Sequence, residues 1–171
     1  KKSSYFFSTL DSLNKKESTI AILGLGYVGL PLLISYAEDN YKVIGIDIDT
    51  DKINSLIEGK SYISYVPNER IIYISKNCIF TSDFKQISEA YSIIICVPTP
   101  LSKHREPNLS YVINAIEKLL QYLKKGQVLS LESTTYPGTT DEIIKPMITE
   151  KGFTIGSDFF LISSPERADP G

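Results

Sequence analysis

The sequence predicts a doubly wound α/β fold, in which a parallel sheet of about six strands carries helices on both faces. Short apolar runs alternate with segments of helical periodicity along almost the whole chain. The first apolar run leads into a glycine-rich turn, and the second leads into an acidic residue. Because strands that alternate with helices are joined by right-handed crossovers, the sheet is expected to be parallel.

The strands are predicted from short apolar runs of the kind that buried parallel strands require. We expect them at residues 19–24, 42–47, 77–80, 91–97, 127–131 and 159–163. Two halves of three strands each predict the strand order 3-2-1-4-5-6. In such a sheet, ligands bind beyond the carboxyl ends of the strands.

The helices are predicted from apolar residues that recur at helical spacing. We expect them at residues 3–14, 27–38, 49–58 and 67–75, in a short segment from 82, at 112–123 and from 139 onward. Pro31 falls in a first turn, where its missing N–H costs little, and Gly59 ends a helix. Residues 139–142 resemble a capping box, and Pro146 is expected to kink or shorten the helix that follows.

The glycine-rich turn fits the spacing G-x-G-x-x-G of Rossmann-like folds. Gly24 permits a tight turn, Gly26 lets a pyrophosphate approach the backbone, and Gly29 lets the helix pack closely on the strand. Asp47 ends the second strand, where a carboxylate can bond a ribose 2′-hydroxyl and repel a 2′-phosphate. We therefore expect NAD rather than NADP. The alternative is a glycine-rich contact between helix and strand without a ligand.

Polar residues also follow the fourth and fifth strands. Thr99 lies between Pro98 and Pro100, in a stiff turn that could hold it against a cofactor or could be a rigid loop without a ligand. The loop after the fifth strand is rich in hydroxyls, and helix capping does not explain Ser133 and Thr134. These side chains are expected at the same edge of the sheet as the glycine turn.

The remaining reactive residues are less specific. Glu166 and Arg167 follow the last strand and are equally compatible with a catalytic pair and with a surface ion pair. Cys78 and Cys96 lack metal-ligand spacing, so we expect no metal site and two reduced thiols in a cytoplasmic protein. His104, the single histidine, lies in a polar loop and is expected at the surface.

Composition excludes several classes of partner. The net charge is −2 and no basic stripe is present, so binding to nucleic acid or to an anionic membrane is not expected. No apolar run approaches the roughly 20 residues of a membrane span. The first residues include no starting methionine and do not form a secretory signal, so we expect a trimmed chain or a fragment.

Together, these motifs resemble the UDP-glucose/GDP-mannose dehydrogenase family. The matching segments are residues 24–31, 45–52, 97–100, 133–139 and 164–171. Residues 61–63, 132–140 and 164–167 resemble the UDP-N-acetylhexosamine 6-dehydrogenase branch more than the UDP-glucose branch. The resemblance begins near residue 17. It implies an NAD-binding domain over residues 17–171, while the apolar spacing of the preceding segment predicts an N-terminal helical extension over residues 1–16.

The resemblance also implies an activity and a site. Such enzymes oxidise the C6 alcohol of a UDP-sugar to a carboxylate with two NAD, through a cysteine thiohemiacetal and thioester. The implied cofactor-binding residues are Gly24, Gly26, Tyr27, Val28, Gly29, Asp47, Lys52, Pro98, Thr99, Ser133 and Thr134. Thr134 would also position water near C6, and Glu166 would orient or activate the hydrolytic water. Arg167 and Ala168 would contact the substrate with Glu166.

The chain departs from the family pattern in one large respect. The nucleophilic cysteine, the residues that assist it, the central helix and the C-terminal substrate domain lie beyond the given sequence, and Asn108 replaces a family acid. The chain alone is therefore expected to bind NAD without completing the reaction, and the full-length protein is expected to be a homodimer. The alternatives are a UDP-glucose 6-dehydrogenase, a non-catalytic NAD-sensing module, and a dehydrogenase of small hydroxy acids.

Overall fold

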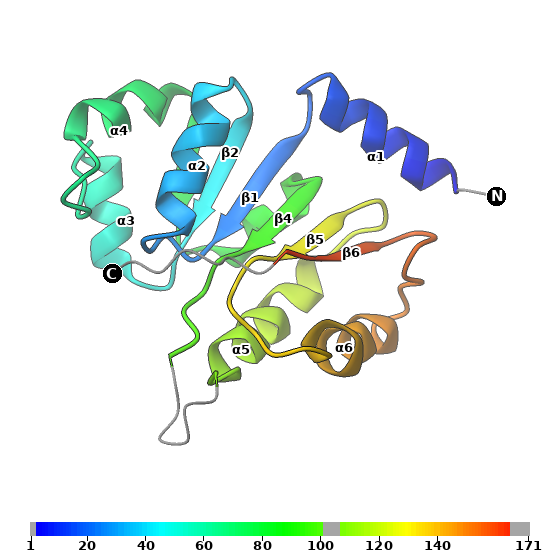
Figure 1. Cartoon of the computed structure of the whole chain (residues 1–171). Coiled ribbons are helices and arrows are strands. Elements are labelled where there is room, and N and C mark those ends of the chain that lie inside the picture. The colour runs from blue at the N-terminus through cyan, green and yellow to red at the C-terminus, as the bar shows by residue number, and fades with distance from the viewer. Residues whose placement is uncertain (1–2, 101–106, 165–171) are drawn as a thin grey trace.

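The computed structural model describes residues 3–100 and 107–164, and it contains one six-stranded parallel sheet (Figure 1). The strands are β1 (Thr19–Leu23), β2 (Lys42–Ile46), β3 (Cys78–Thr81), β4 (Ser92–Ile95), β5 (Val128–Leu131) and β6 (Phe160–Ser163). Their order in the sheet is β3-β2-β1-β4-β5-β6, and every neighbouring pair is parallel. The predicted doubly wound topology is confirmed.

Helices cover both faces of this sheet (Figure 1). The α-helices are α1 (Ser4–Asn14), α2 (Gly29–Glu38), α3 (Thr50–Ile57), α4 (Asn68–Ile74), α5 (Ser110–Leu119) and α6 (Lys145–Glu150). Short 3-10 segments lie at η1 (Ser75–Asn77), η2 (Phe84–Glu89) and η3 (Leu120–Tyr122), and a π-helical segment lies at η4 (Thr139–Ile144). In Figure 1, α2, α3 and α4 lie on one side of the sheet, and α5 and α6 lie on the other.

The strand sequences explain why both faces are covered. In β1, Ala21 and Leu23 belong to the core cluster under α5 and α6, whereas Ile20 and Ile22 belong to the cluster under α2, α3 and α4. Side chains alternate between the two faces of a strand, so a continuous apolar run fills both cores at once. This double burial fixes β1 at the centre of the sheet.

The capping box predicted at residues 139–142 is wrong. Gly138, with φ +96°, precedes the segment, and no side chain caps it. The Thr139 hydroxyl donates instead to the Tyr136 carbonyl, at 2.8 Å. The helical run passes directly from the π-helical η4 into α6 at Ile144 and Lys145, so Pro146 lies in the first turn of α6. Proline is tolerated in a first turn, where its missing N–H would have no partner within the helix.

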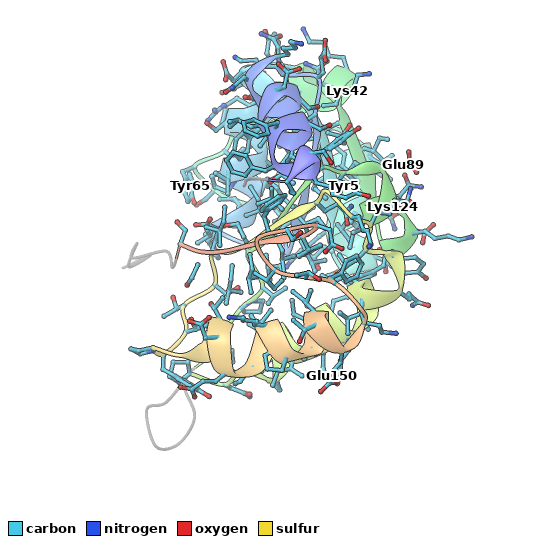
Figure 2. The ribbon with its side chains drawn as sticks, turned by 90° about the vertical axis from the view of Figure 1, so that its right-hand side faces the viewer. Tyr5, Lys42, Tyr65, Glu89, Lys124 and Glu150 are labelled. Carbon is cyan, nitrogen blue, oxygen red and sulfur yellow. The ribbon has the colours of Figure 1, made fainter. Side chains whose placement is uncertain are left out.

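Helix α1 packs at the amino ends of the strands, opposite the edge where ligands bind. The Thr9 hydroxyl donates to the Gly126 carbonyl at 2.6 Å, just before β5. The Phe6 and Phe160 rings lie 5.8 Å apart, and the Tyr41 hydroxyl donates to the Leu13 carbonyl at 3.3 Å. Figure 2 shows α1 facing the viewer, with Tyr65 at the left of the view and Lys124 at the right. The amino edge is therefore occupied by protein.

Candidate cofactor-binding site

A cavity of about 840 Å³ opens at the carboxyl edge of the sheet, between the loops that follow β1, β2, β4 and β5. A cavity of this size suits a cofactor. The predicted residues that line it are Gly24, Gly26, Tyr27, Val28, Asp47, Lys52, Pro98, Thr99, Ser133 and Thr134. Gly29 lies behind this lining, at the start of α2. The structure thus brings the described candidates together, while Glu166, Arg167, Ala168 and His104 lie outside the described residues.

The three glycines of the turn have different surroundings. Gly24 adopts φ +93°, and a Cβ built on it would lie 2.7 Å from the Cys96 carbonyl oxygen. A Cβ on Gly29 would lie 1.8 Å from the Gly24 carbonyl oxygen. A Cβ on Gly26 would meet nothing within 4 Å. Gly24 and Gly29 are therefore required by the protein's own packing, whereas the space beside Gly26 is open to a ligand.

Three backbone donors of the turn belong to residues that line the cavity. Within the described part of the chain, no acceptor is found for the N–H groups of Gly26, Tyr27 and Val28. Helix α2 begins at Gly29 without a side-chain cap, so its positive dipole end is unneutralised there. Free N–H groups at a helix N-terminus form an anion-binding site, so these residues fit the pyrophosphate of a dinucleotide.

Asp47 is buried, with 7% of its surface exposed, and it connects two loops of the site. Its Oδ2 accepts from the Leu25 N–H at 2.8 Å, and its Oδ1 accepts from the Asp49 N–H at 3.0 Å. The Lys52 Nζ lies 3.7 Å from Oδ2. An ionised carboxylate has about four acceptor positions, so Asp47 retains capacity for a ribose hydroxyl. Sequence reasoning missed the bond to Leu25, because that bond joins the loops that follow two different strands.

At the other end of the cleft, Ser133 joins the loops after β4 and β5. Its hydroxyl donates to the Val97 carbonyl at 2.8 Å, and its N–H donates to the Ile95 carbonyl at 3.1 Å. These bonds hold the polypeptide that carries Thr134 beside the turn that carries Thr99. Both threonines line the cavity. The two hydroxyl-bearing loops are therefore parts of one site.

Sequence reasoning missed one wall of the cleft. Helix α5 and the loops after β2 and β3 contribute further lining residues: Ile48, Phe84, Tyr111, Asn114 and Lys118. The Ile48 side chain is 65% exposed although it is aliphatic, and Lys118 Nζ lies 5.6 Å from the centre of the Phe84 ring. In the sequence, the available signal was an isoleucine, Ile48, placed directly after the strand-end acid Asp47.

The described residues also bear on metal binding, thiol chemistry and membrane insertion. Among them, no group of three or more histidine, cysteine, aspartate or glutamate residues could hold a metal ion. Cys78 and Cys96 form no disulfide within the described residues, and burial raises the pKa of Cys78 to about 12, which disfavours its thiolate. In the same part of the chain, no helix has the length and apolar character needed to cross a membrane.

The fold and the cleft define a class of protein. A parallel sheet of order 3-2-1-4-5-6 with free amides at its first turn and an acid after its second strand is the architecture of dinucleotide-binding domains. The chain belongs to the UDP-glucose/GDP-mannose dehydrogenase family, because residues 18–171 match the model of that family's NAD binding domain. NAD is accordingly the cofactor of this domain.

Known relatives are similar over most of the chain. It is 36% identical over 156 residues to UDP-N-acetyl-D-glucosamine 6-dehydrogenase of Salmonella typhi, covering 91% of this chain and 36% of that protein. It is 35% identical to UDP-N-acetyl-D-mannosamine dehydrogenase of Pyrococcus horikoshii, covering 89% and 37%. The native structure of the UDP-N-acetyl-mannosamine dehydrogenase Cap5O from Staphylococcus aureus matches with a TM-score of 0.82 and 35% identity, covering 90% and 38%. The chain thus spans little more than a third of these relatives.

Proposed function

We propose that the chain is the NAD-binding portion of a nucleotide-sugar 6-dehydrogenase. The complete enzyme would oxidise the C6 alcohol of UDP-N-acetylglucosamine or UDP-N-acetylmannosamine to a uronate, with two NAD per turnover. The observation that carries this proposal is the continuous cleft from Asp47, past the glycine turn, to Thr134. The names of the relatives support the substrate class.

Each end of the cleft has a distinct role in this proposal. Asp47 and Lys52 would hold the adenosine ribose, and the free N–H groups of Gly26 and Val28 would bind the pyrophosphate. The nicotinamide, which accepts a hydride from the sugar carbon, would lie toward Thr99 and Thr134. Ser133 would act through its bonds to the Ile95 and Val97 carbonyls, which fix the position of Thr134.

We infer that this chain alone binds NAD without completing the oxidation. The covalent steps need a thiolate at the substrate, and neither cysteine suits that role. Cys96 is buried against Gly24 and Gly29 in the wall of the cofactor cleft, and the thiol of Cys78 is held protonated by burial. The nucleophile would come from another part of the complete enzyme.

Thr134→Ala and Glu166→Gln, made in the complete enzyme, are expected to lower turnover at least tenfold, about 1.4 kcal/mol in barrier, while NAD affinity changes little. Both side chains are proposed to act on the water and C6 rather than on the adenosine half. Steady-state turnover and NAD affinity would be measured on each variant. Thr149→Ala is the matched control, because that hydroxyl donates to the Pro146 carbonyl on an exposed helix. Wild-type turnover in both test variants would remove their catalytic assignment.

The substrate proposal is tested with the complete enzyme, NAD and a panel of sugars. We expect two NADH per sugar with UDP-N-acetylglucosamine or UDP-N-acetylmannosamine. Preferred turnover of UDP-glucose would support the alternative UDP-glucose 6-dehydrogenase. Turnover of small hydroxy acids, or NAD binding without turnover of any substrate, would instead indicate a different dehydrogenase or an NAD-sensing module.

We further propose that the complete protein is a homodimer that acts in the cytoplasm and binds no nucleic acid. The lack of a disulfide between Cys78 and Cys96 in the described residues, and the net charge of −2 of this chain, support that setting. Light scattering of the complete protein would decide the oligomeric state, and a monomeric mass would contradict the dimer.

A further inference from the structure

A loop between α3 and α4 reaches across to the glycine turn with two tyrosine hydroxyls. The Tyr62 hydroxyl donates to the Leu25 carbonyl at 2.6 Å, and the Tyr65 hydroxyl donates to the Tyr27 carbonyl at 3.2 Å. The Tyr27 and Tyr65 rings lie 6.5 Å apart. Each accepting carbonyl shares its peptide group with the N–H of the next residue, Gly26 or Val28, and both of these residues line the cavity.

These bonds restrict the orientation of two peptide groups. In a trans peptide, the C=O and the next N–H point in opposite directions. The described part of the chain contains no cis peptide. The bond that holds the Leu25 carbonyl toward Tyr62 therefore directs the Gly26 N–H away from the tyrosine loop. The bond that holds the Tyr27 carbonyl toward Tyr65 likewise directs the Val28 N–H away from it. Both are among the N–H groups without an acceptor in the described residues.

The peptide groups on either side of Gly26 need such a restraint on their orientation. Glycine has wide conformational freedom, and its surroundings here leave open space where a Cβ would lie. The phenol of Tyr62 is half-buried, and burial raises its pKa, with the nearby carboxylates of Asp47 and Asp49 adding to the shift. The hydroxyl therefore remains a protonated donor. The Lys52 Nζ lies 5.9 Å from the Tyr62 ring centre and 3.7 Å from Asp47 Oδ2.

We propose that Tyr62 and Tyr65 are positioning residues, which orient the Gly26 and Val28 N–H groups toward the pyrophosphate before the cofactor binds. The inference rests on the proposed function, in that the ligand of the turn is the pyrophosphate of NAD. Orienting donors in advance removes an entropic cost of binding, so the benefit appears in affinity for pyrophosphate compounds. Neither tyrosine needs to touch the cofactor.

The test compares ligands with and without a pyrophosphate on the 171-residue chain. Tyr62→Phe removes one hydroxyl and keeps the ring. We expect its dissociation constant for ADP-ribose to rise about tenfold, roughly 1.4 kcal/mol, while that for adenosine changes less than about twofold. Both constants would be measured by amide shift titration, with the melting temperature recorded for each variant.

Tyr41→Phe is the matched control, because it removes a phenol that donates to the Leu13 carbonyl far from the turn. Tyr65→Phe, at an exposed position, should weaken ADP-ribose in the same selective way by about threefold. If Tyr62→Phe lowers the melting temperature, the Tyr65→Phe variant provides the decisive test of the positioning role. Equal weakening of both ligands, or unchanged ADP-ribose affinity, would overturn the positioning role. A wild-type chain that binds neither NAD nor ADP-ribose would contradict the proposed function instead.

Discussion

Gly26→Ala is expected to weaken NAD binding at least about a hundredfold, or 2.7 kcal/mol, while leaving the melting temperature nearly unchanged. Gly26 is not among the positive-φ glycines, and its Cβ would meet no protein atom within 4 Å. Alanine should therefore fit the folded structure, and it also lowers the conformational entropy of the unfolded chain. The new methyl group would nevertheless occupy the space that the free N–H groups of Gly26, Tyr27 and Val28 surround. Calorimetric titration and thermal melting of the same preparation check both halves of this expectation.

Gly29→Ala provides the control for this experiment. Its Cβ would lie 1.8 Å from the Gly24 carbonyl oxygen, a distance that no rotamer change can relieve. Overpacking of this kind costs roughly 1–3 kcal/mol or more, so the melting temperature should fall clearly. If Gly26→Ala instead bound NAD as the wild type does, the pyrophosphate could not lie where we place it.

The second large effect concerns Asp47. We expect the chain to bind NAD at least about tenfold more tightly than NADP, which corresponds to roughly 1.4 kcal/mol. A 2′-phosphate brought to the ribose position would face a buried carboxylate, and like charges about 4 Å apart repel by roughly 4 kcal/mol at an effective dielectric constant of 20. The positive charge of Lys52 offsets part of that repulsion. We therefore give tenfold as the lower bound of the preference for NAD over NADP. Asp47→Asn should reduce the preference to within about threefold.

Asp47→Asn should also lower stability, by about 1–3 kcal/mol, because one of two backbone N–H groups loses its acceptor. Asp158→Asn is the matched control. Asp158 is likewise buried, accepts from the Thr154 N–H at 2.7 Å and pairs with Lys125, but it lies near the amino edge of the sheet. It should lose stability without changing the ratio of NAD to NADP affinity. Equal affinity of the wild type for the two cofactors would remove the selectivity assigned to Asp47.

Much of the fold could be predicted because its signals are local. An apolar run such as residues 20–23 fills both cores, so it indicates a central parallel strand without any knowledge of its neighbours. The glycine spacing predicted the turn because φ and close packing exclude other residues at Gly24 and Gly29. The capping box failed because the Glu142 N–H, which the Thr139 hydroxyl would have to accept, donates instead to the Gly138 carbonyl at 2.8 Å.

The unpredicted parts of the site depend on contacts between distant segments. The bond from Leu25 to Asp47 and the bonds from Tyr62 and Tyr65 to the turn arise only when the chain has folded. Helix α5 supplies Asn114 and Lys118 to the cleft, although its sequence displays mainly the stripe that faces the core. Sequence patterns report the face of a helix that is buried, and they say little about which polar residues border a cavity.

The central claim is that the dinucleotide lies along the carboxyl edge of the sheet, with its pyrophosphate at the glycine turn. A ¹H–¹⁵N correlation spectrum of the ¹⁵N-labelled 171-residue chain, titrated with NAD, tests it most directly. We predict large downfield shifts for the amides of Gly26, Tyr27 and Val28 and smaller shifts at Thr134, while Thr9 at the amino edge does not move. Unshifted glycine-turn amides at saturating NAD, or shifts centred on α1, would contradict the account.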